Sequence, residues 1–268
     1  MKNFCNYTVT GDSGEAVILV HGSLSTKAQW DSLVDFLSTD YRVITYNVIG
    51  YGGTPFPEDP ADYSLKEESD LINAVIDDVL EPDELYHIVG HSYGGVIALY
   101  HTFYNSRRIK SFTGYEPMSF HLLDKSNELI SLASMLIETI KSDIDRGNPM
   151  DGVEKFINLW SAPGTFEVLP EAEKNTMAEG IKKMVLDFRE AAGTPLSTKD
   201  YSKIETSACL IGGTRSPEYS TDIVKLLSST LKNNQLHWVK SGHFGPLSHG
   251  DLVNPIIGDF LNQSSDIA

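Results

Sequence analysis

The feature that most constrains how this chain folds is a serine set between two glycines, in the order Gly90-x-Ser92-x-Gly94. An apolar run over 85–89 precedes this segment, and an apolar, helix-like run over 96–100 follows it. A strand that turns at once into a helix needs residues without bulky side chains on both sides of the turn, and glycine removes the Cβ clash. The segment therefore predicts a strand, a tight and strained turn that exposes the serine hydroxyl, and a helix.

Length, charge and cysteine content narrow the class of protein. The chain has 268 residues, of which 41% are hydrophobic, which is enough for one sizeable α/β domain with an insertion. Its net charge of −16 opposes binding to nucleic acid or to anionic membranes. Residues 1–6 lack the apolar run of a secretion signal, and two cysteines, Cys5 and Cys209, make a disulfide framework unlikely. We expect a soluble, cytoplasmic protein that binds a small molecule and neither nucleic acid nor membrane.

Strand-like and helix-like segments alternate along most of the chain, which is typical of a parallel sheet with both faces covered. The expected strands are 4–10, 15–20, 42–47, 85–90, 109–115, 206–212 and 235–240. The expected helices are 27–38, 66–80, 94–105, 218–231 and 250–262. Between about 118 and 203 the apolar spacing is helical, with Gly- and Pro-containing breaks between three helices. This pattern predicts a core domain over 1–117 and 204–268 and a helical cap (lid) over 118–203.

Serine is a poor nucleophile unless a base lies within hydrogen-bond reach, and the chain offers eight histidines. His243 follows the last predicted strand and precedes the last helix, so its loop can reach over the carboxyl ends of the strands, where Ser92 is expected. His87 and His101 resemble ordinary strand and helix residues, and His249 is better placed to cap or pack beside the final helix. His243 is therefore the predicted base.

A carboxylate should hold that imidazole in the right tautomer and stabilise its positive form. The common position after the penultimate strand carries Ser216, whose hydroxyl can orient an imidazole but cannot neutralise it. Glu116 stands where the chain leaves the sheet for the cap, and the proline after it stiffens the exit. We favour Glu116 as the acid, with Glu218 and then Asp222 as the alternatives.

Acyl transfer also needs N–H donors for the negative oxygen of the tetrahedral intermediate. The residue after the nucleophile, Tyr93, supplies one backbone N–H. The loop after strand 15–20 should supply the other from Ser23, with His21 and Gly22 shaping the turn. Ser23 and Tyr93 are therefore the predicted oxyanion hole.

These segments together resemble the α/β-hydrolase superfamily over essentially the whole chain. Residues 90–95 look like its nucleophile elbow and 242–244 like its histidine loop. Residues 47–54 look like its Asp-x-Arg-Gly-x-Gly-x-Ser loop, with Asn47 and Ile49 in place of the Asp and the Arg. The resemblance implies the α/β-hydrolase fold, a mostly parallel central sheet flanked by helices with a helical cap insertion.

The pairing of Glu116 with Ser216 is similar to a subset of these hydrolases that carry the acid after the sixth strand. The resemblance implies a serine hydrolase that needs no cofactor or metal and cleaves a small carboxylic ester or related acyl substrate through an acyl-enzyme. The expected triad is Ser92, His243 and Glu116. A thioesterase, lactonase or carbon–carbon bond hydrolase with the same triad is one alternative, and a slow or non-catalytic ligand receptor is another. A serine nucleophile argues against haloalkane dehalogenation and epoxide hydrolysis, which in this superfamily use an aspartate.

Overall fold

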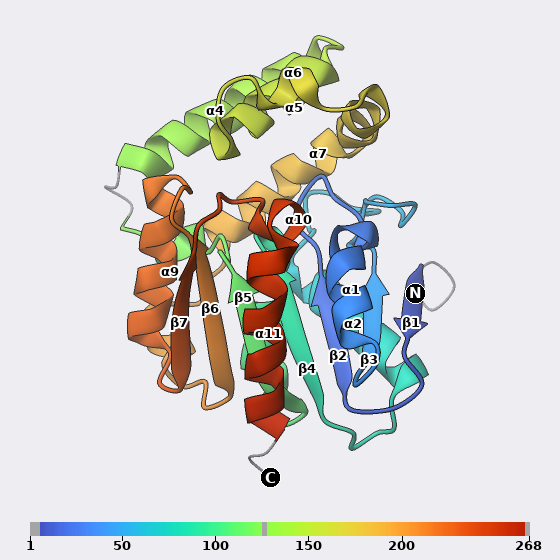
Figure 1. Ribbon diagram of the computed structural model, residues 1–268. Helices are drawn as coiled ribbons and strands as arrows, with labels where there is room; N and C mark the ends of the chain where they lie inside the picture. The colour runs from blue at the N-terminus through green and yellow to red at the C-terminus, as the bar shows by residue number, and fades with distance from the viewer. Residues whose placement is uncertain (1–5, 125–127, 266–268) are drawn as a thin grey trace.

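The computed structural model describes residues 6–124 and 128–265, and its strands form one seven-stranded sheet (Figure 1). The strands are β1 (Tyr7–Thr10), β2 (Ala16–Val20), β3 (Arg42–Tyr46), β4 (Tyr86–His91), β5 (Ile109–Tyr115), β6 (Ser207–Gly213) and β7 (Asn234–Val239). Their order across the sheet is β1-β3-β2-β4-β5-β6-β7. Only the pairing of β1 with β3 is antiparallel in this sheet, so the carboxyl ends of β2 to β7 lie at one edge.

Helices cover both faces of the sheet. They are α1 (Asp31–Leu37), α2 (Leu65–Val79), α3 (Tyr93–Asn105), α9 (Glu218–Thr230) and α11 (Gly250–Ser265), with the short turns η1 (Lys27–Trp30) and α10 (Gly245–Ser248). Apolar side chains of α1 and α11 share one buried cluster with one face of the sheet, and those of α2, α3 and α9 share a second cluster with the other face. Burial on both sides explains why a central strand such as β2 is a continuous apolar run.

A helical insertion separates β5 from β6. It contains η2 (Phe120–Leu122), α4 (Glu128–Asp145), α5 (Pro149–Trp160), α6 (Thr165–Val168), α7 (Glu171–Gly193) and α8 (Thr198–Tyr201). Figure 1 shows α4 to α7 lying across the carboxyl ends of the strands. Buried residues of these helices, such as Ile140, Val153 and Met184, belong to the same apolar cluster as the sheet. The division into a core and a cap over 118–203 stays a prediction.

The expected strands and their parallel arrangement are confirmed, with most boundaries within one residue. The first observed strand begins at Tyr7, and residues 4 and 5 of the expected one lie outside the described residues, as does Cys5. Cys209 is buried within β6 as a free thiol. The insertion follows β5, the fifth strand of the described sheet.

One helix start differs in detail from expectation. The segment expected as one helix over 27–38 begins with the 3-10 turn η1, capped by the side chain of Thr26, before α1 starts at Asp31. The helix α9 starts at Glu218 as expected, with Pro217 as its N-cap. Among the described residues, none of the helices has the length and apolar character needed to cross a bilayer.

Candidate active site

Ser92 lies in the turn between β4 and α3, with φ of 55° and ψ of −121°. A non-glycine residue at positive φ is strained, and the surrounding backbone has to hold it there. A Cβ on Gly90 would come within 2.4 Å of the Gly94 carbonyl oxygen. A Cβ on Gly94 would lie 2.3 Å from the carbonyl oxygens of Val20 and His21. The two glycines therefore permit the close approach of β2, β4 and α3 that forms this turn.

The three side chains predicted as a triad form one hydrogen-bonded chain. Ser92 Oγ lies 2.9 Å from His243 Nε2, and His243 Nδ1 lies 2.7 Å from Glu116 Oε2. They come from the ends of β4 and β5 and from the loop after β7, which the parallel sheet brings to one edge. With Nδ1–H donated to the carboxylate, Nε2 is free to accept the serine proton.

Glu116 is fully buried, and its backbone also lies at positive φ, 43°. Its N–H donates to the carbonyl oxygen of Ile211 at 2.9 Å. Its carboxylate accepts hydrogen bonds from the Gly213 N–H at 2.7 Å and from the Ser220 hydroxyl at 2.6 Å. These contacts hold Glu116 against the end of β6. Although Glu116 follows β5, its carboxylate therefore lies near the position that an acid placed after β6 would occupy.

Opposing effects act on the ionisation of Glu116. Burial raises the pKa of this carboxyl, but the hydrogen bond and positive charge of His243 lower it, and so do the nearby hydroxyls of Ser216 and Ser220. The net effect is a pKa below the ordinary value. Glu116 is therefore ionised at neutral pH and able to stabilise an imidazolium.

The two alternative acids point elsewhere. Glu218 is exposed at the first position of α9. Asp222 pairs with Lys225 one turn further along the same helix, at 3.1 Å. Neither has a hydrogen bond to His243 among the described contacts, whereas Glu116 does.

The predicted oxyanion loop lies beside the nucleophile. Tyr93 is the first residue of α3, so its N–H has no acceptor within the helix. The Gly22 N–H donates to Gln29 Oε1 at 3.1 Å, and the Ser23 hydroxyl donates to Asp187 Oδ2 at 2.5 Å. These two hydrogen bonds hold the loop in place, and neither of them uses the backbone N–H of Ser23.

Two further buried histidines support the site without reaching the serine. His21 Nε2 accepts the Val48 N–H at 3.0 Å, and burial lowers the pKa of His21 to about 4. His91 Nε2 donates to the His243 carbonyl oxygen at 2.9 Å. Burial, followed by the charge of His243, lowers the pKa of His91 to about 3. Both rings are neutral at pH 7, and His91 holds the loop that carries His243.

Asn47 supplies the polar contacts of its loop although it replaces the family's aspartate. Its side-chain oxygen accepts the Lys27 N–H at 2.8 Å, and its side-chain nitrogen donates to the Gly52 carbonyl oxygen at 2.8 Å. The loop is therefore held by an uncharged amide.

Trp160, at the end of α5, stacks on the imidazole of His243 with 4.2 Å between ring centroids and 22° between planes. In the sequence, Trp160 lies within the segment 118–203 that is expected to be helical. An aromatic residue in an apolar helical stripe gives no sign of which neighbour its ring will cover.

A buried cluster of charges joins the helical insertion to the core, and it was not predicted. Lys183 on α7 is fully buried and pairs with Asp187 one turn away and with Glu68 on α2, at 3.2 Å for the latter. Tyr51 also donates to Asp187, at 2.5 Å. A lysine and an aspartate four residues apart on a helix with an apolar face were the only signal, and that spacing is equally typical of an exposed pair.

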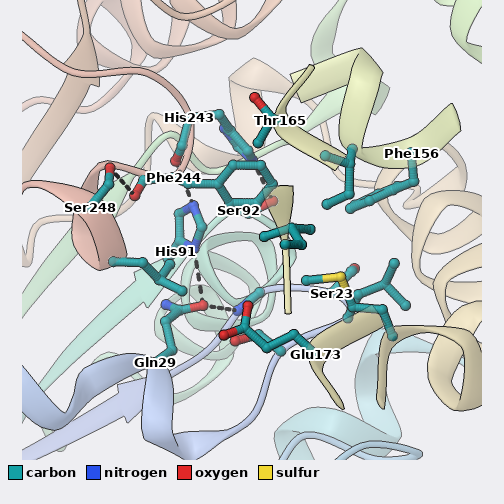
Figure 2. A pocket seen from close by; sticks show the side chains of 17 residues that line it. Ser23, Gln29, His91, Ser92, Phe156, Thr165, Glu173, His243, Phe244 and Ser248 are labelled. Atoms are coloured by element: carbon teal, nitrogen blue, oxygen red, sulfur yellow. Dashed lines mark hydrogen bonds between the residues drawn. The ribbon is translucent and has the colours of Figure 1, made fainter. Parts of the chain in front are cut away.

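Two cavities adjoin Ser92, with volumes of about 380 Å³ and about 30 Å³. Figure 2 shows side chains around the larger one, with Ser92 and His243 facing into it. Within the described residues, no group of three or more His, Cys, Asp or Glu side chains is arranged to hold a metal ion. The arrangement places a hydroxyl, an imidazole and an ionised carboxylate beside a cavity of small-molecule size.

Comparison with known proteins agrees with this architecture. The family described as alpha/beta hydrolase fold matches residues 15–139. A "Probable lysophospholipase BODYGUARD 4" of Arabidopsis thaliana is 33% identical over 113 residues, which are 41% of this chain but only 26% of that protein. A "Putative non-heme chloroperoxidase" of Synechocystis is 24% identical over 93% of this chain and 92% of its own length.

Solved structures show the same fold. A thermophilic esterase from Thermogutta terrifontis superposes with a TM-score of 0.79 at 18% identity, covering 97% of this chain and 93% of that one. At this identity the likeness concerns the fold alone. The partial family match and the shared architecture show that this chain has the α/β-hydrolase fold.

Proposed function

We propose that this chain is a serine hydrolase that cleaves a small carboxylic ester or related acyl compound through a Ser92–His243–Glu116 triad. The observation that carries the proposal is the unbroken hydrogen-bonded chain from the Ser92 hydroxyl through His243 to a buried carboxylate, beside a cavity of about 380 Å³. An ordered triad next to an enclosed cavity is the arrangement that acyl transfer requires. Residues 118–203 act as the cap, because they supply Trp160 and Phe156 to this site.

In the first half-reaction, His243 Nε2 takes the proton of Ser92 as Oγ bonds to the carbonyl carbon. The carbonyl oxygen gains the electron pair and is held by the N–H groups of Tyr93 and Ser23, each donor being worth roughly 3 kcal/mol. The tetrahedral intermediate then expels the alcohol oxygen, which receives its proton from His243. Glu116 stabilises the imidazolium while it exists.

In the second half-reaction, His243 takes a proton from water as the water oxygen attacks the acyl carbon. The new intermediate expels Ser92 Oγ, which regains a proton from the imidazolium. The carboxylic acid leaves, and the enzyme returns to its starting protonation state.

The proposal is tested by hydrolysis of short p-nitrophenyl esters and by labelling with a fluorophosphonate, with the labelled peptide found by mass spectrometry. We expect turnover and a label on Ser92, and Ser92→Ala should lose both while keeping the thermal unfolding midpoint. A folded wild-type protein that neither turns over a broad ester panel nor takes the label at Ser92 would contradict the proposal. That result would favour the receptor alternative.

A further inference from the structure

Ser92 lies between two cavities of very different size. The larger, of about 380 Å³, extends past the loop after β7 and is also bounded by Met177 and Leu247. The smaller, of about 30 Å³, lies toward the middle of α7 and is bounded by Met184 and Phe188. An ester held at Ser92 has one group on each side of its carbonyl carbon, so the two cavities can each take one of them.

The position of His243 decides which group goes where. The leaving alcohol oxygen takes its proton from His243, so it has to lie on the side of the serine that His243 borders. His243 and the next residue, Phe244, line the larger cavity and are absent from the lining of the smaller one. The alcohol part therefore extends into the larger cavity, and the acyl part points into the smaller one.

The smaller cavity limits the acyl group to a very short one. A single water molecule needs roughly 10–15 Å³ of such space, so about 30 Å³ accepts a methyl or ethyl group without rearrangement. Most of the side chains that line this cavity are packed tightly against other residues. Met118 and Met184 are almost completely buried, and Phe120 packs on Phe188 with 4.9 Å between ring centroids. A longer acyl chain would have to displace packed side chains.

Charge around the two cavities disfavours an anionic substrate. The smaller cavity is lined by Asp187, whose carboxylate is held in place by Ser23, Tyr51 and Lys183. The larger cavity is lined by Glu173 and by no lysine or arginine among the described residues. In the described part of the chain, neither cavity is lined by a lysine or arginine that could pair with a carboxylate or phosphate group.

From this geometry we infer that the preferred substrate is an uncharged ester of a very short acid, acetyl or propionyl, with a bulkier and mainly apolar alcohol. The inference rests on the proposed function and adds the direction in which the substrate lies. The acyl-enzyme that it predicts is a short-chain acyl group on Ser92.

Two isomeric esters test this direction. Hexyl acetate and ethyl hexanoate have the same atoms and nearly the same polarity, and both release a primary alcohol, but the long chain lies on opposite sides of the carbonyl. We expect kcat/KM for hexyl acetate to exceed that for ethyl hexanoate by about tenfold or more, the scale set by a few methylenes that a pocket cannot hold.

Two variants on α7 serve as a matched pair. Phe188→Ala enlarges the smaller cavity and should raise kcat/KM for ethyl hexanoate relative to hexyl acetate about tenfold. Met177→Ala enlarges only the larger cavity, so it should change the preference among acetate esters of different alcohols and leave the preference for a short acyl group intact. Both side chains are only partly buried, so folding should tolerate the changes.

The possible results distinguish failure of the inferred substrate direction from failure of the proposed hydrolase function. Hydrolysis of both isomers with ethyl hexanoate equal to or better than hexyl acetate overturns the inferred direction and leaves the serine hydrolase intact. Hydrolysis of neither, together with no fluorophosphonate label on Ser92, overturns the proposed function and the inference with it. A preference for hexyl acetate that Phe188→Ala reduces about tenfold, and Met177→Ala leaves unchanged, supports the inference.

Discussion

Trp160 lies face to face with His243, so a residue of the helical insertion covers one side of the predicted catalytic imidazole. The two nitrogens of that ring hydrogen-bond to Ser92 and Glu116. An indole face attracts a cation by roughly 1–2 kcal/mol when the pair is shielded from water. In the proposed reaction, we expect this stack to stabilise the imidazolium form of His243 and to hold the ring in line with Ser92.

Replacing Trp160 tests this role as a positioning residue. Trp160→Leu should lower kcat about tenfold, because about 1.4 kcal/mol of stabilisation is lost from a state that exists only during the reaction. Trp160→Phe keeps an aromatic face and should recover most of the activity. Steady-state kinetics with p-nitrophenyl acetate measure both. A wild-type kcat in a folded Trp160→Leu protein would show that the stack is only packing.

Glu116→Gln should reduce kcat by about 10³- to 10⁴-fold, because the amide cannot stabilise the imidazolium and can favour the wrong tautomer. The matched control is Glu218→Gln, which changes an exposed carboxyl at the start of α9 and should have little effect. Circular dichroism and thermal unfolding establish that both variants fold. The opposite pattern, with Glu218→Gln inactive, would move the acid to the loop after β6.

Sequence reasoning predicted what depends on local pattern and on strand direction. Buried strands are apolar runs, the glycines around Ser92 mark a tight turn, and a parallel sheet brings the ends of its strands to one edge. Ser92, His243 and Glu116 could therefore be grouped although they are up to 151 positions apart.

Contacts made by the inserted helices could not be predicted in this way. The Trp160 stack and the pairing of Lys183 with Glu68 depend on how α5 and α7 are tilted and rotated over the sheet. Packing of side chains from distant segments sets those angles, and an amphipathic pattern defines only which side of a helix is buried. The sizes of the two cavities depend on the same packing.

Acid should weaken the fold through Glu15. Burial opposes ionisation of this carboxyl, but hydrogen bonds from Lys110, Ser265 and His87 outweigh it and lower its pKa from 4.5 to about 2. Because the folded pKa is the lower one, the stabilisation is fully present above about pH 4.5 and is lost as the pH falls toward 2. The side chain is 38% exposed, so solvent screening leaves on the order of 1 kcal/mol.

Urea unfolding of Glu15→Gln measures this contribution. The variant should be less stable than wild type at pH 7, and the difference should shrink between pH 4.5 and pH 2. Glu58→Gln, at an exposed position, is the control and should follow wild type throughout. A difference for Glu15→Gln that stays constant down to pH 2 would rule out ionisation as its cause.

Lys183→Met should destabilise the protein by roughly 3–5 kcal/mol, because it leaves two buried carboxylates without their cation. The adjacent exposed lysine gives the control, since Lys182→Met removes the same charge from the surface and should cost less than about 0.5 kcal/mol. Chemical denaturation of both variants makes the comparison. Equal stability of the two would show that the buried pairs contribute no net stabilisation.

The buried charges of Lys183, Asp187 and Glu68 also bear on how a molecule can reach Ser92. The salt bridge of Lys183 joins α7 to Glu68 on α2. Asp187, also on α7, accepts hydrogen bonds from Ser23 and Tyr51. Lifting α7 as a hinged cover would expose a broken ion pair to the low-dielectric interior before water could reach it. We therefore expect a small molecule to reach Ser92 from the side of the larger cavity that Glu173 and Leu247 line, without displacement of α7.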